Sequence, residues 1–400
     1  MNTRRIGIGA VVVVGLVALF FVGKYLITNK QTTPEQAKTD NKKEKTEERS
    51  QQVAQLVHQA CLYADSVGID TTRFTLNADA ARNEEKLTDV LEEIRYGKKP
   101  SRMAFSGLKE TVDSTWSAKA DPASLDTLST FAPYKQLVGH YNRLRKQGSS
   151  PALADSLRLI RQTLNFYRYI NRFDPDQFVL VNIPAGELNV FDRTGKRLLP
   201  MQVIAGKPDK MTPCMATYIQ DIVMYPYWNV PKNIALEEML PRMKRNIAYI
   251  YNQNLQILDA KDHEVDPEDI NWEELSETNF PYRVRQASGC ENSLGLLKFN
   301  LANPLAIYLH DTNSRDLFKN TTDRWRSHGC VRVQKPVELA NLVLGTPTFD
   351  AAFMNKCLID QKPKTLPIPK RFPVFIVYNV ADVDSTGKLH FYNDVYSLDK

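Results

Sequence analysis

Residues 327–333 read Ser-His-Gly-Cys-Val-Arg-Val, and residues 308–312 read Tyr-Leu-His-Asp-Thr. A cysteine becomes a strong nucleophile when its thiolate is stabilised, and a nearby imidazolium is the commonest means. His328 stands two residues before Cys330, so on an extended chain the two side chains point to the same side. Gly329 between them leaves the backbone open to a closely approaching oxygen atom. The stretch therefore predicts a cysteine nucleophile.

Two other interpretations fit part of this pattern. A free cysteine in a long chain is most often a small buried hydrophobic residue. A zinc site could use His310, His328 and Cys330 as ligands, but one intervening residue is shorter than usual zinc-ligand spacing, and no second Cys/His pair occurs nearby. The sequence therefore favours nucleophilic catalysis without a metal or another cofactor.

The complete pattern resembles the signature of the L,D-transpeptidase (YkuD-type) catalytic domain. That signature is a first histidine, a spacer, then Ser/Thr-His-Gly-Cys, an apolar residue and Arg or Asn. Here His310 is followed by a spacer of sixteen residues and then by Ser327 to Arg332. Other family blocks are matched at residues 181–185, 203–208 and 225–231 and at Arg285, Gln286, Gly289, Asn292 and Gly295, with a departure at Cys290.

The resemblance implies a reaction on the stem peptides of peptidoglycan. Cys330 would attack the carbonyl after the third stem residue and release D-alanine, while His310 takes the thiol proton and later donates it. Backbone N–H groups around Gly329 and Cys330 would hold the oxyanion. The side-chain amine of a second stem peptide would open the thioester and cross-link two third residues. The same implication makes Cys330 a target for carbapenem-type acylation.

The remaining residues of the expected site have supporting roles. His328 and Arg332 would order the turn and bind the substrate carboxylate. Asp311 would orient His310 through its side chain or its backbone carbonyl. The residues expected to contact substrate are Arg332, Ser327, Tyr308, Asp311 and Trp228, and no cofactor or metal is implied.

Other functions remain compatible with the same motif. An L,D-carboxypeptidase or endopeptidase would use the same acyl-enzyme with water as the acceptor. Attachment of a protein lysine to peptidoglycan would use another acceptor. A non-catalytic wall-binding protein is the third alternative, but binding alone requires neither His310 nor Cys330.

The N-terminal residues predict a membrane anchor and a tether. Ile6–Gly23 is an uncharged run of 18 residues, roughly 27 Å as a helix against a hydrocarbon core of about 30 Å. We interpret residues 1–27 as an uncleaved signal anchor of the inner membrane, with a cleaved signal peptide as the alternative and the catalytic domain in the periplasm. Residues 28–52 contain no large apolar run and predict a disordered tether.

The charge balance gives no sign of nucleic-acid binding. The net charge is +6, and residues 1–52 alone hold nine Lys and Arg against five acidic residues. The basic excess therefore lies mostly in the anchor and tether rather than on a folded surface.

Periodicity predicts an α+β fold after the tether. Apolar residues at helical spacing indicate a helical scaffold over residues 53–150 and a connecting helix within 151–177. From residue 178 to 400 the period changes to two, which predicts a mixed, β-sandwich-like catalytic domain. The period-two pattern of apolar residues is interrupted at residues 233–279. The long branch of the L,D-transpeptidases carries a capping subdomain at this place, and we expect the same here.

Five cysteines are present, which is an odd number, so at least one thiol stays unpaired in an oxidising compartment. A free Cys330 would account for the unpaired thiol. The others are Cys61, Cys214, Cys290 and Cys357. A pair between Cys214 and Cys290 and the absence of any pair both remain open.

Overall fold

The computed structural model describes residues 34–77, 79–113, 115, 125, 130–319, 322–355 and 361–399. The predicted membrane anchor and Cys357 lie outside these residues. Within the described part of the chain, no helix is long and apolar enough to cross a membrane. Two compact units are distinguished, residues 1–53 and 54–400, and the second contains every feature discussed below except the start of the first helix.

Helix α1, Pro34–Ser66, begins inside the segment that the sequence predicted to be a disordered tether, residues 28–52. Its first half is rich in Glu, Lys and Gln, which have high helix propensity because they lose little side-chain entropy in a helix. Without apolar side chains the segment cannot form a core, but it can still form a helix. Composition alone did not separate these two properties.

The helical scaffold is present and also contributes a strand. Side-chain caps start two of its helices: Asp79 accepts from the backbone N–H of Ala81, and Ser150 accepts from that of Leu153. Strand β1 runs parallel to strand β5 of the main sheet, so the scaffold is joined to the sheet by backbone hydrogen bonds. The scaffold elements are η1 (Thr72–Phe74), α2 (Ala80–Tyr96), β1 (Met103–Ser106), α3 (Ala132–Arg145) and α4 (Pro151–Ile170).

A ten-stranded mixed sheet forms the centre of the second unit. Its order is β1-β5-β10-β11-β13-β4-β3-β2-β14, with β12 paired to β4 and a further pairing between β5 and β14. The strands are β2 (Gln177–Asn182), β3 (Glu187–Asp192), β4 (Arg197–Gly206), β5 (Cys214–Met224), β10 (Leu297–Leu301), β11 (Leu309–His310), β12 (Trp325–Ser327), β13 (Val331–Val333) and β14 (Lys364–Val377).

The β5–β14 pairing closes the sheet on itself, which differs from the expected sandwich of two layers. Strand β14 is 14 residues long, and it pairs in parallel with β2 and antiparallel with β5. One long, bulged strand can therefore join both edges, whereas period-two patterning reports burial and not which strands pair. The remaining elements are η7 (Arg315–Lys319), α8 (Pro336–Leu344), η8 (Ala351–Asn355), β15 (Ala381–Val383) and β16 (Leu389–Phe391).

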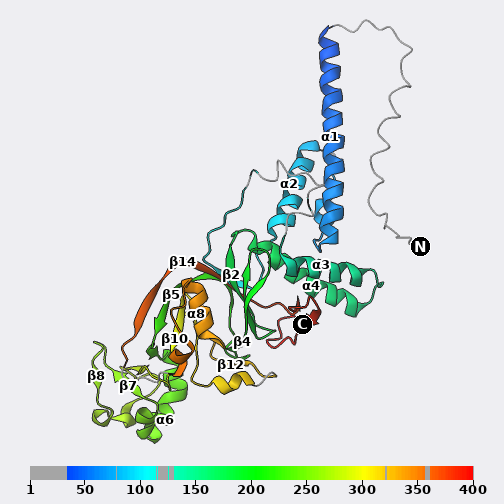
Figure 1. Cartoon of the computed structure of the whole chain (residues 1–400). Coiled ribbons are helices and arrows are strands. Elements are labelled where there is room, and N and C mark those ends of the chain that lie inside the picture. Colours follow the sequence, from blue (N-terminus) through cyan, green and yellow to red (C-terminus); the bar gives the residue numbers. More distant parts are fainter. Residues whose placement is uncertain are drawn as a thin grey trace, which may run out of the picture. The chain divides into compact units, whose positions relative to one another are not determined.

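The expected insertion folds around a small core of its own, which includes Ile234, Met243, Ile250, Ile257 and Val284. Figure 1 shows it at the end of the sheet away from α3 and α4. Its elements are α5 (Lys232–Ile234), the π-helical turn η4 (Ala235–Met239), α6 (Leu240–Arg245), α7 (Ala248–Asn252), β7 (Leu255–Leu258), β8 (Glu264–Val265), η5 (Pro267–Asp269) and η6 (Trp272–Glu274). With β6 (Trp228–Asn229) and β9 (Arg283–Gln286) it forms a four-stranded sheet, β6-β9-β7-β8.

Candidate active site

Two short neighbouring strands bring the expected catalytic residues together. Strand β11 runs parallel to β13, with Leu309 beside Val331 and His310 beside Arg332. This register places Cys330 beside Tyr308, whose carbonyl accepts the N–H of Val331 at 3.1 Å. Side chains alternate along a strand, so Tyr308, His310, Cys330 and Arg332 share one face of the sheet. On the other face, Leu309, Val331 and Val333 are fully buried in the core.

The turn that holds Cys330 is closed by Ser327. The Ser327 hydroxyl donates to the Cys330 carbonyl at 2.5 Å and accepts the Gly329 N–H at 3.2 Å. On the other side, Thr212 Oγ1 donates to the Gly329 carbonyl at 2.7 Å. Gly329 has φ = +116°, a conformation that a residue with a side chain would adopt only under strain.

These contacts correct two sequence-based expectations. Ser327 is 2% exposed, and its hydroxyl organises the turn instead of facing a substrate. The Gly329 N–H is already used by Ser327, whereas the Cys330 N–H has no hydrogen-bond partner among the described residues. The backbone donor that remains available at the nucleophile is therefore that of Cys330 itself.

His310 is held in one orientation and in the neutral state. Its Nδ1 lies 2.5 Å from the carbonyl oxygen of Asp311, so Nδ1 must carry the proton and Nε2 has the free lone pair. The ring is 5% exposed. Burial lowers the pKa of His310 to about 3, and the positive charges of Arg332 and Lys298 act in the same direction against the Asp311 hydrogen bond.

Asp311 orients His310 through its backbone, which answers the question that the sequence left open. Its carboxylate accepts the Leu296 N–H at 2.8 Å and pairs with Arg315 at 2.8 Å. Gly295, with φ = +61°, has no room for a Cβ because the Asp311 carboxylate occupies that space. The Asp311 side chain is 1% exposed, so the expected substrate contact by this residue is not supported.

The Cys330 thiol is also neutral at rest. Burial raises its pKa, and a hydrogen bond from Tyr308 and the positive charge of Lys298 oppose that rise. The thiol lies 3.7 Å from the carbonyl oxygen of Ala306; among the described residues no hydrogen bond joins it to His310. The expected thiolate stabilised by an imidazolium is therefore wrong for the resting structure, because burial disfavours both charges.

Lys298 is a site residue that the sequence analysis missed. It lies beside His310 on β10, and its Nζ is 4.3 Å from the centroid of the Tyr308 ring. Burial lowers the pKa of Lys298, and within the described part of the chain its ammonium group has no hydrogen bond or ion pair. One signal was available: a lysine stands between Leu297 and Phe299, inside a strand whose alternate residues are buried.

Arg332 is the second cation of this face without an acidic partner in the described residues. Its Nε is buried and makes no hydrogen bond there, and burial lowers the pKa of its guanidinium group. A buried cation without a partner is costly. Arg332 and Lys298 flank His310 on its neighbouring strands, and together they make this face suitable for an anion.

His328 does not point toward Cys330 as the sequence predicted. Its Nε2 lies 2.7 Å from the Glu238 carboxylate, while Lys210 pairs with Glu237 at 3.3 Å. The alternation rule fails because residues 328–330 form a bend rather than a strand. Both acids belong to the turn η4, so these two ion pairs fasten the insertion to the catalytic turn and to the loop before β5.

Trp228 connects the insertion to the site. It is half-buried on β6 and packs against the core of the insertion, and its side chain forms a hydrogen bond with Tyr308. The Tyr308 hydroxyl also interacts with the Cys330 thiol, and burial raises the pKa of this hydroxyl strongly. Trp228 and Tyr308 therefore lie around the thiol, and their contact with substrate stays a prediction.

The cysteines separate into two classes. Cys61, Cys214 and Cys330 are free thiols, whereas Cys290 is disulfide-bonded. A bond between Cys214 and Cys290 is therefore excluded. No three His, Cys, Asp or Glu side chains converge as metal ligands would, as far as the described residues extend.

Comparison with known proteins gives matches that agree with one another. Residues 176–374 match the model of the L,D-transpeptidase catalytic domain, YkuD. A Haemophilus influenzae protein described as a putative L,D-transpeptidase is 39% identical over 222 residues, which are 56% of this chain and 44% of that protein. The chain therefore matches less than half the length of this relative.

Solved structures of L,D-transpeptidases have lower sequence identity to this chain. An Enterococcus faecium L,D-transpeptidase catalytic domain acylated by ertapenem is 11% identical, with 51% of this chain and 98% of that chain covered and a TM-score of 0.24. A second L,D-transpeptidase, LdtMt1 in complex with imipenem, is 12% identical, with 50% and 59% covered and a TM-score of 0.21. Scores this low carry no structural argument, so the similarity rests on the matches in sequence.

Proposed function

Residues 176–374 match the model of the L,D-transpeptidase catalytic domain, and from this match we propose that the protein cross-links the third residues of peptidoglycan stem peptides. The observation that carries the proposal is the pairing of β11 with β13. It places a free thiol, Cys330, and a neutral base, His310, on one face of the sheet beside two cations that have no acidic partner among the described residues.

The first half of the proposed reaction is acyl transfer to the enzyme. Cys330 Sγ attacks the carbonyl carbon after the third stem residue, and its proton passes to His310 Nε2 as the C–S bond forms. The transfer accompanies the attack because neither group is charged at rest. The unpaired Cys330 N–H donates to the tetrahedral oxyanion. The C–N bond then breaks, and His310 returns the proton to the leaving amine of D-alanine.

The second half releases the enzyme. The side-chain amine of another stem peptide attacks the thioester carbonyl, and His310 accepts its proton. The C–S bond breaks, and the thiolate is protonated to regenerate Cys330. The products are an amide between two third residues and a free enzyme, so no oxidant or cofactor is consumed.

Lys298 and Arg332 have two roles in this scheme. Both positive charges keep His310 in its basic form, since each lowers the pKa of the imidazole. Neither has an acidic partner among the described residues, so both can bind a carboxylate of the donor peptide. The thiolate that forms when the thioester breaks would also be stabilised by Lys298, whose charge lowers the pKa of Cys330.

The insertion is proposed to act as a lid. It is held to the catalytic turn by the ion pair between His328 and Glu238 and to the site by the contact of Trp228 with Tyr308. Removal of residues 233–279 should abolish turnover and leave a folded sheet, because the insertion has its own core. An unchanged rate after this deletion would exclude the lid.

Residues 1–27 are proposed to anchor the protein in the inner membrane, with the catalytic domain in the periplasm. The support is the length of the uncharged run and the location of the proposed substrate outside the membrane. Alkali extraction of membranes checks it: the full-length protein should stay in the pellet, and release into the supernatant would contradict the anchor.

Product analysis tests the proposed reaction. The full-length protein in detergent is incubated with a purified disaccharide-tetrapeptide, beside Cys330→Ala, and the products are analysed by mass spectrometry. A dimer that has lost one alanine, formed only by the wild type, is expected. A tripeptide monomer alone would identify a carboxypeptidase instead, and no product would contradict catalysis. Ertapenem should add one drug-derived acyl group to the wild type and none to Cys330→Ala.

A further inference from the structure

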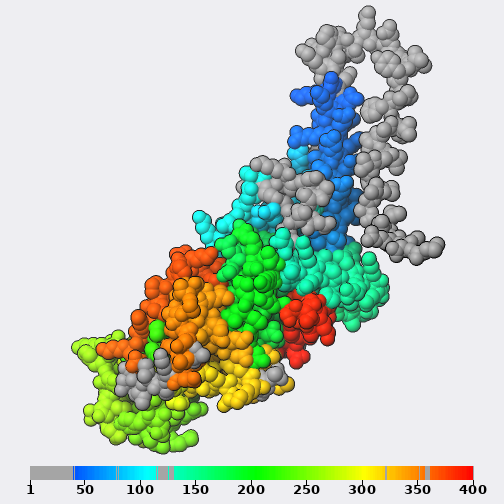
Figure 2. All heavy atoms as spheres, viewed as in Figure 1, coloured from blue at the N-terminus to red at the C-terminus, as the bar shows by residue number. Residues whose placement is uncertain are grey.

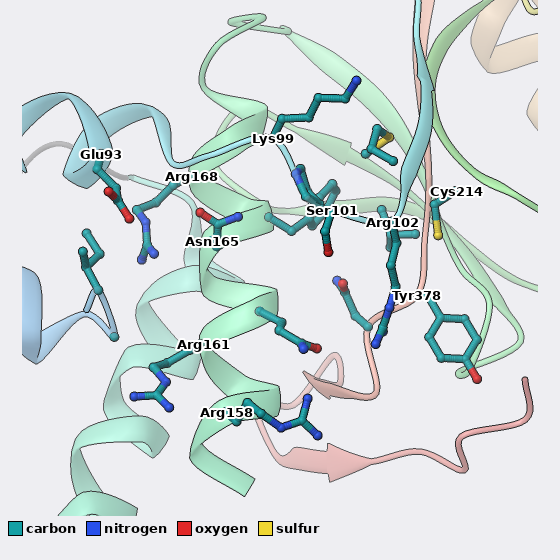
Figure 3. Close-up of a pocket in the computed structure, with 18 of the residues that line it drawn as sticks. Glu93, Lys99, Ser101, Arg102, Arg158, Arg161, Asn165, Arg168, Cys214 and Tyr378 are labelled. Carbon is teal, nitrogen blue, oxygen red and sulfur yellow. The ribbon is translucent and has the colours of Figure 1, made fainter. Parts of the chain in front are cut away.

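A cavity of about 360 Å³ lies outside the active site, between α4, residues 99–103 and strands β5 and β14. Its lining contains no residue of the catalytic turn. Figure 3 shows Arg158, Arg161 and Asn165 on α4, and Cys214 beside Arg102 on the other side. The cavity therefore lies at the junction of the helical scaffold and the sheet.

The cavity has an excess of positive charge. Five cationic side chains line it: Lys99, Arg102, Arg158, Arg161 and Arg168. The acidic lining residues are Asp70 and Glu93. Asp70 accepts from the Thr72 hydroxyl at 2.7 Å, and the charge of Arg161 acts on it, while Glu93 pairs with Arg73 and with Lys98. Two lining acids against five lining cations still leave an excess of positive charge.

Part of this cationic surface already holds an acidic peptide, the C-terminal segment of the chain. Arg102 binds both carboxylate oxygens of Asp399, at 2.7 and 2.8 Å, and Arg158 binds one of them at 3.1 Å. The same two arginines donate to the backbone carbonyls of Leu398 and Asp399. Figure 2 shows the C-terminal segment, in red, against the scaffold helices. Carboxylate and main chain are thus recognised together, as peptide recognition requires.

The rest of the cationic surface keeps unused donors, although Arg168 Nη1 donates to the Val67 carbonyl at 2.8 Å. Lys99 and Arg161 make no hydrogen bond or ion pair with any described residue, and both are exposed. Arg168 is 2% exposed, and its Nε has no hydrogen-bond partner in the described part of the chain. Such a buried donor is costly to leave unpaired. Apolar side chains, among them Ile69, Met103 and Phe166, form another part of the lining.

From these observations we propose that the cavity is a second, non-catalytic binding site for a short peptide that carries carboxylates. Lys99 and Arg161 bind the acidic groups, and the apolar wall packs against the remainder of the peptide. Two sources have this chemistry: the stem peptide of the proposed substrate and the C-terminal segment of another copy of this chain. The site does not depend on the proposed reaction, because it contains neither Cys330 nor His310.

Two methionines allow the two sites to be observed separately. Met103 lines the cavity, and the Met211 backbone lies beside Gly329 in the catalytic turn. The full-length Cys330→Ala protein is labelled with 13C-methyl methionine and titrated with a free stem tetrapeptide, with the same peptide carrying amides in place of its carboxylates, and with a peptide of residues 395–399. We expect the Met103 signal to shift with an acidic peptide and not with the amidated one.

Charge removal supplies the matched control. Lys99→Ala combined with Arg161→Ala should weaken the binding reported by Met103 by at least about tenfold, as expected for two lost charged contacts, and leave the Met211 response unchanged. Lys109→Ala with Lys146→Ala removes two exposed cations outside the cavity and should change neither signal. The peptide that shifts Met103 identifies the source.

The proposal is overturned if Met103 responds to no peptide, if the amidated peptide binds equally well, or if the Lys99 and Arg161 substitutions have no more effect than their control. A shift of Met211 alone would leave the proposed reaction intact and remove this second site. A shift of Met103 alone would support this second site and contradict binding of the peptide at the catalytic turn.

Discussion

Two free cysteines lie on the same sheet in contrasting surroundings. Cys330 precedes β13 and faces Tyr308, with Lys298 and His310 nearby. Cys214 begins β5, where Arg102 is the nearest charge, and that arginine is already bound to Asp399. Burial raises the pKa of both thiols, to about 12 for Cys214.

The difference shows that burial alone does not decide which thiol reacts. Cys330 has a neutral histidine on the same face to take its proton and an unpaired backbone N–H to hold an oxyanion. Among the described residues the charge that acts on the Cys214 thiol is that of Arg102, which cannot take a proton. Reactivity therefore depends on the partners that the sheet register supplies.

The largest effect on the rate is expected when each of the two cysteines is replaced by alanine in a separate variant. Cys330→Ala should lower transpeptidation by at least about 10⁴-fold, because covalent catalysis is lost. Cys214→Ala should change the rate less than about twofold. Rates measured by the release of D-alanine check both variants. Equal losses in the two variants would break the comparison.

The next effect concerns the base. His310→Gln should lower kcat by about 10²- to 10⁴-fold, the range of general acid–base catalysis, with a smaller change in KM. The glutamine can still donate to the Asp311 carbonyl, so thermal unfolding should show a folded protein. If kcat survives in this variant, the proton goes to another group.

Substitution of Arg332 tests whether its positive charge keeps His310 neutral. His310 has a pKa of about 3, so it stays unprotonated as the pH falls through 6.5, and kcat/KM should show no acid limb from this group between pH 5 and 8. Arg332→Met removes a positive charge, which raises the pKa of His310 and moves the acid limb upward. An acid limb near pH 6.5 in the wild type would contradict the neutral resting state.

Lys298 should have a moderate effect on the thiol. Lys298→Met removes the charge that lowers the pKa of Cys330, so the pKa should rise and alkylation of Cys330 at pH 8 should slow by up to about tenfold, the equivalent of one pKa unit. Lys298→Arg is the matched control and should retain most of the rate. Identical alkylation in both variants would exclude an electrostatic role.

The smallest effect is expected at the attachment of the insertion. Glu238→Gln removes a partly exposed ion pair with His328, and such pairs are worth about 0.2–1 kcal/mol. KM should therefore rise by no more than about fivefold, with faster hydrogen exchange over residues 234–245. Glu277→Gln, elsewhere on the insertion, should change neither. A larger effect at Glu277 would contradict the attachment.

The sequence predicted the nucleophile, the base and the presence of an insertion, since these depend on a contiguous motif or on a break in periodicity. It could not predict Lys298, because the partners of a strand depend on which strands pair. The same limit explains the missed strand β1 and the closure of the sheet by β14. The orientation of His328 was wrong because a glycine bend cancels the alternation that a strand would impose.

The site assigned to Cys330 can be tested directly by the mass of the acyl-enzyme. Full-length protein is mixed with the stem tetrapeptide, quenched in acid within seconds and digested for mass spectrometry. We expect one added tripeptide acyl group on the peptide that contains Cys330 and none on the peptide that contains Cys214. An acyl group on Cys214, or turnover that persists in Cys330→Ala, would contradict it.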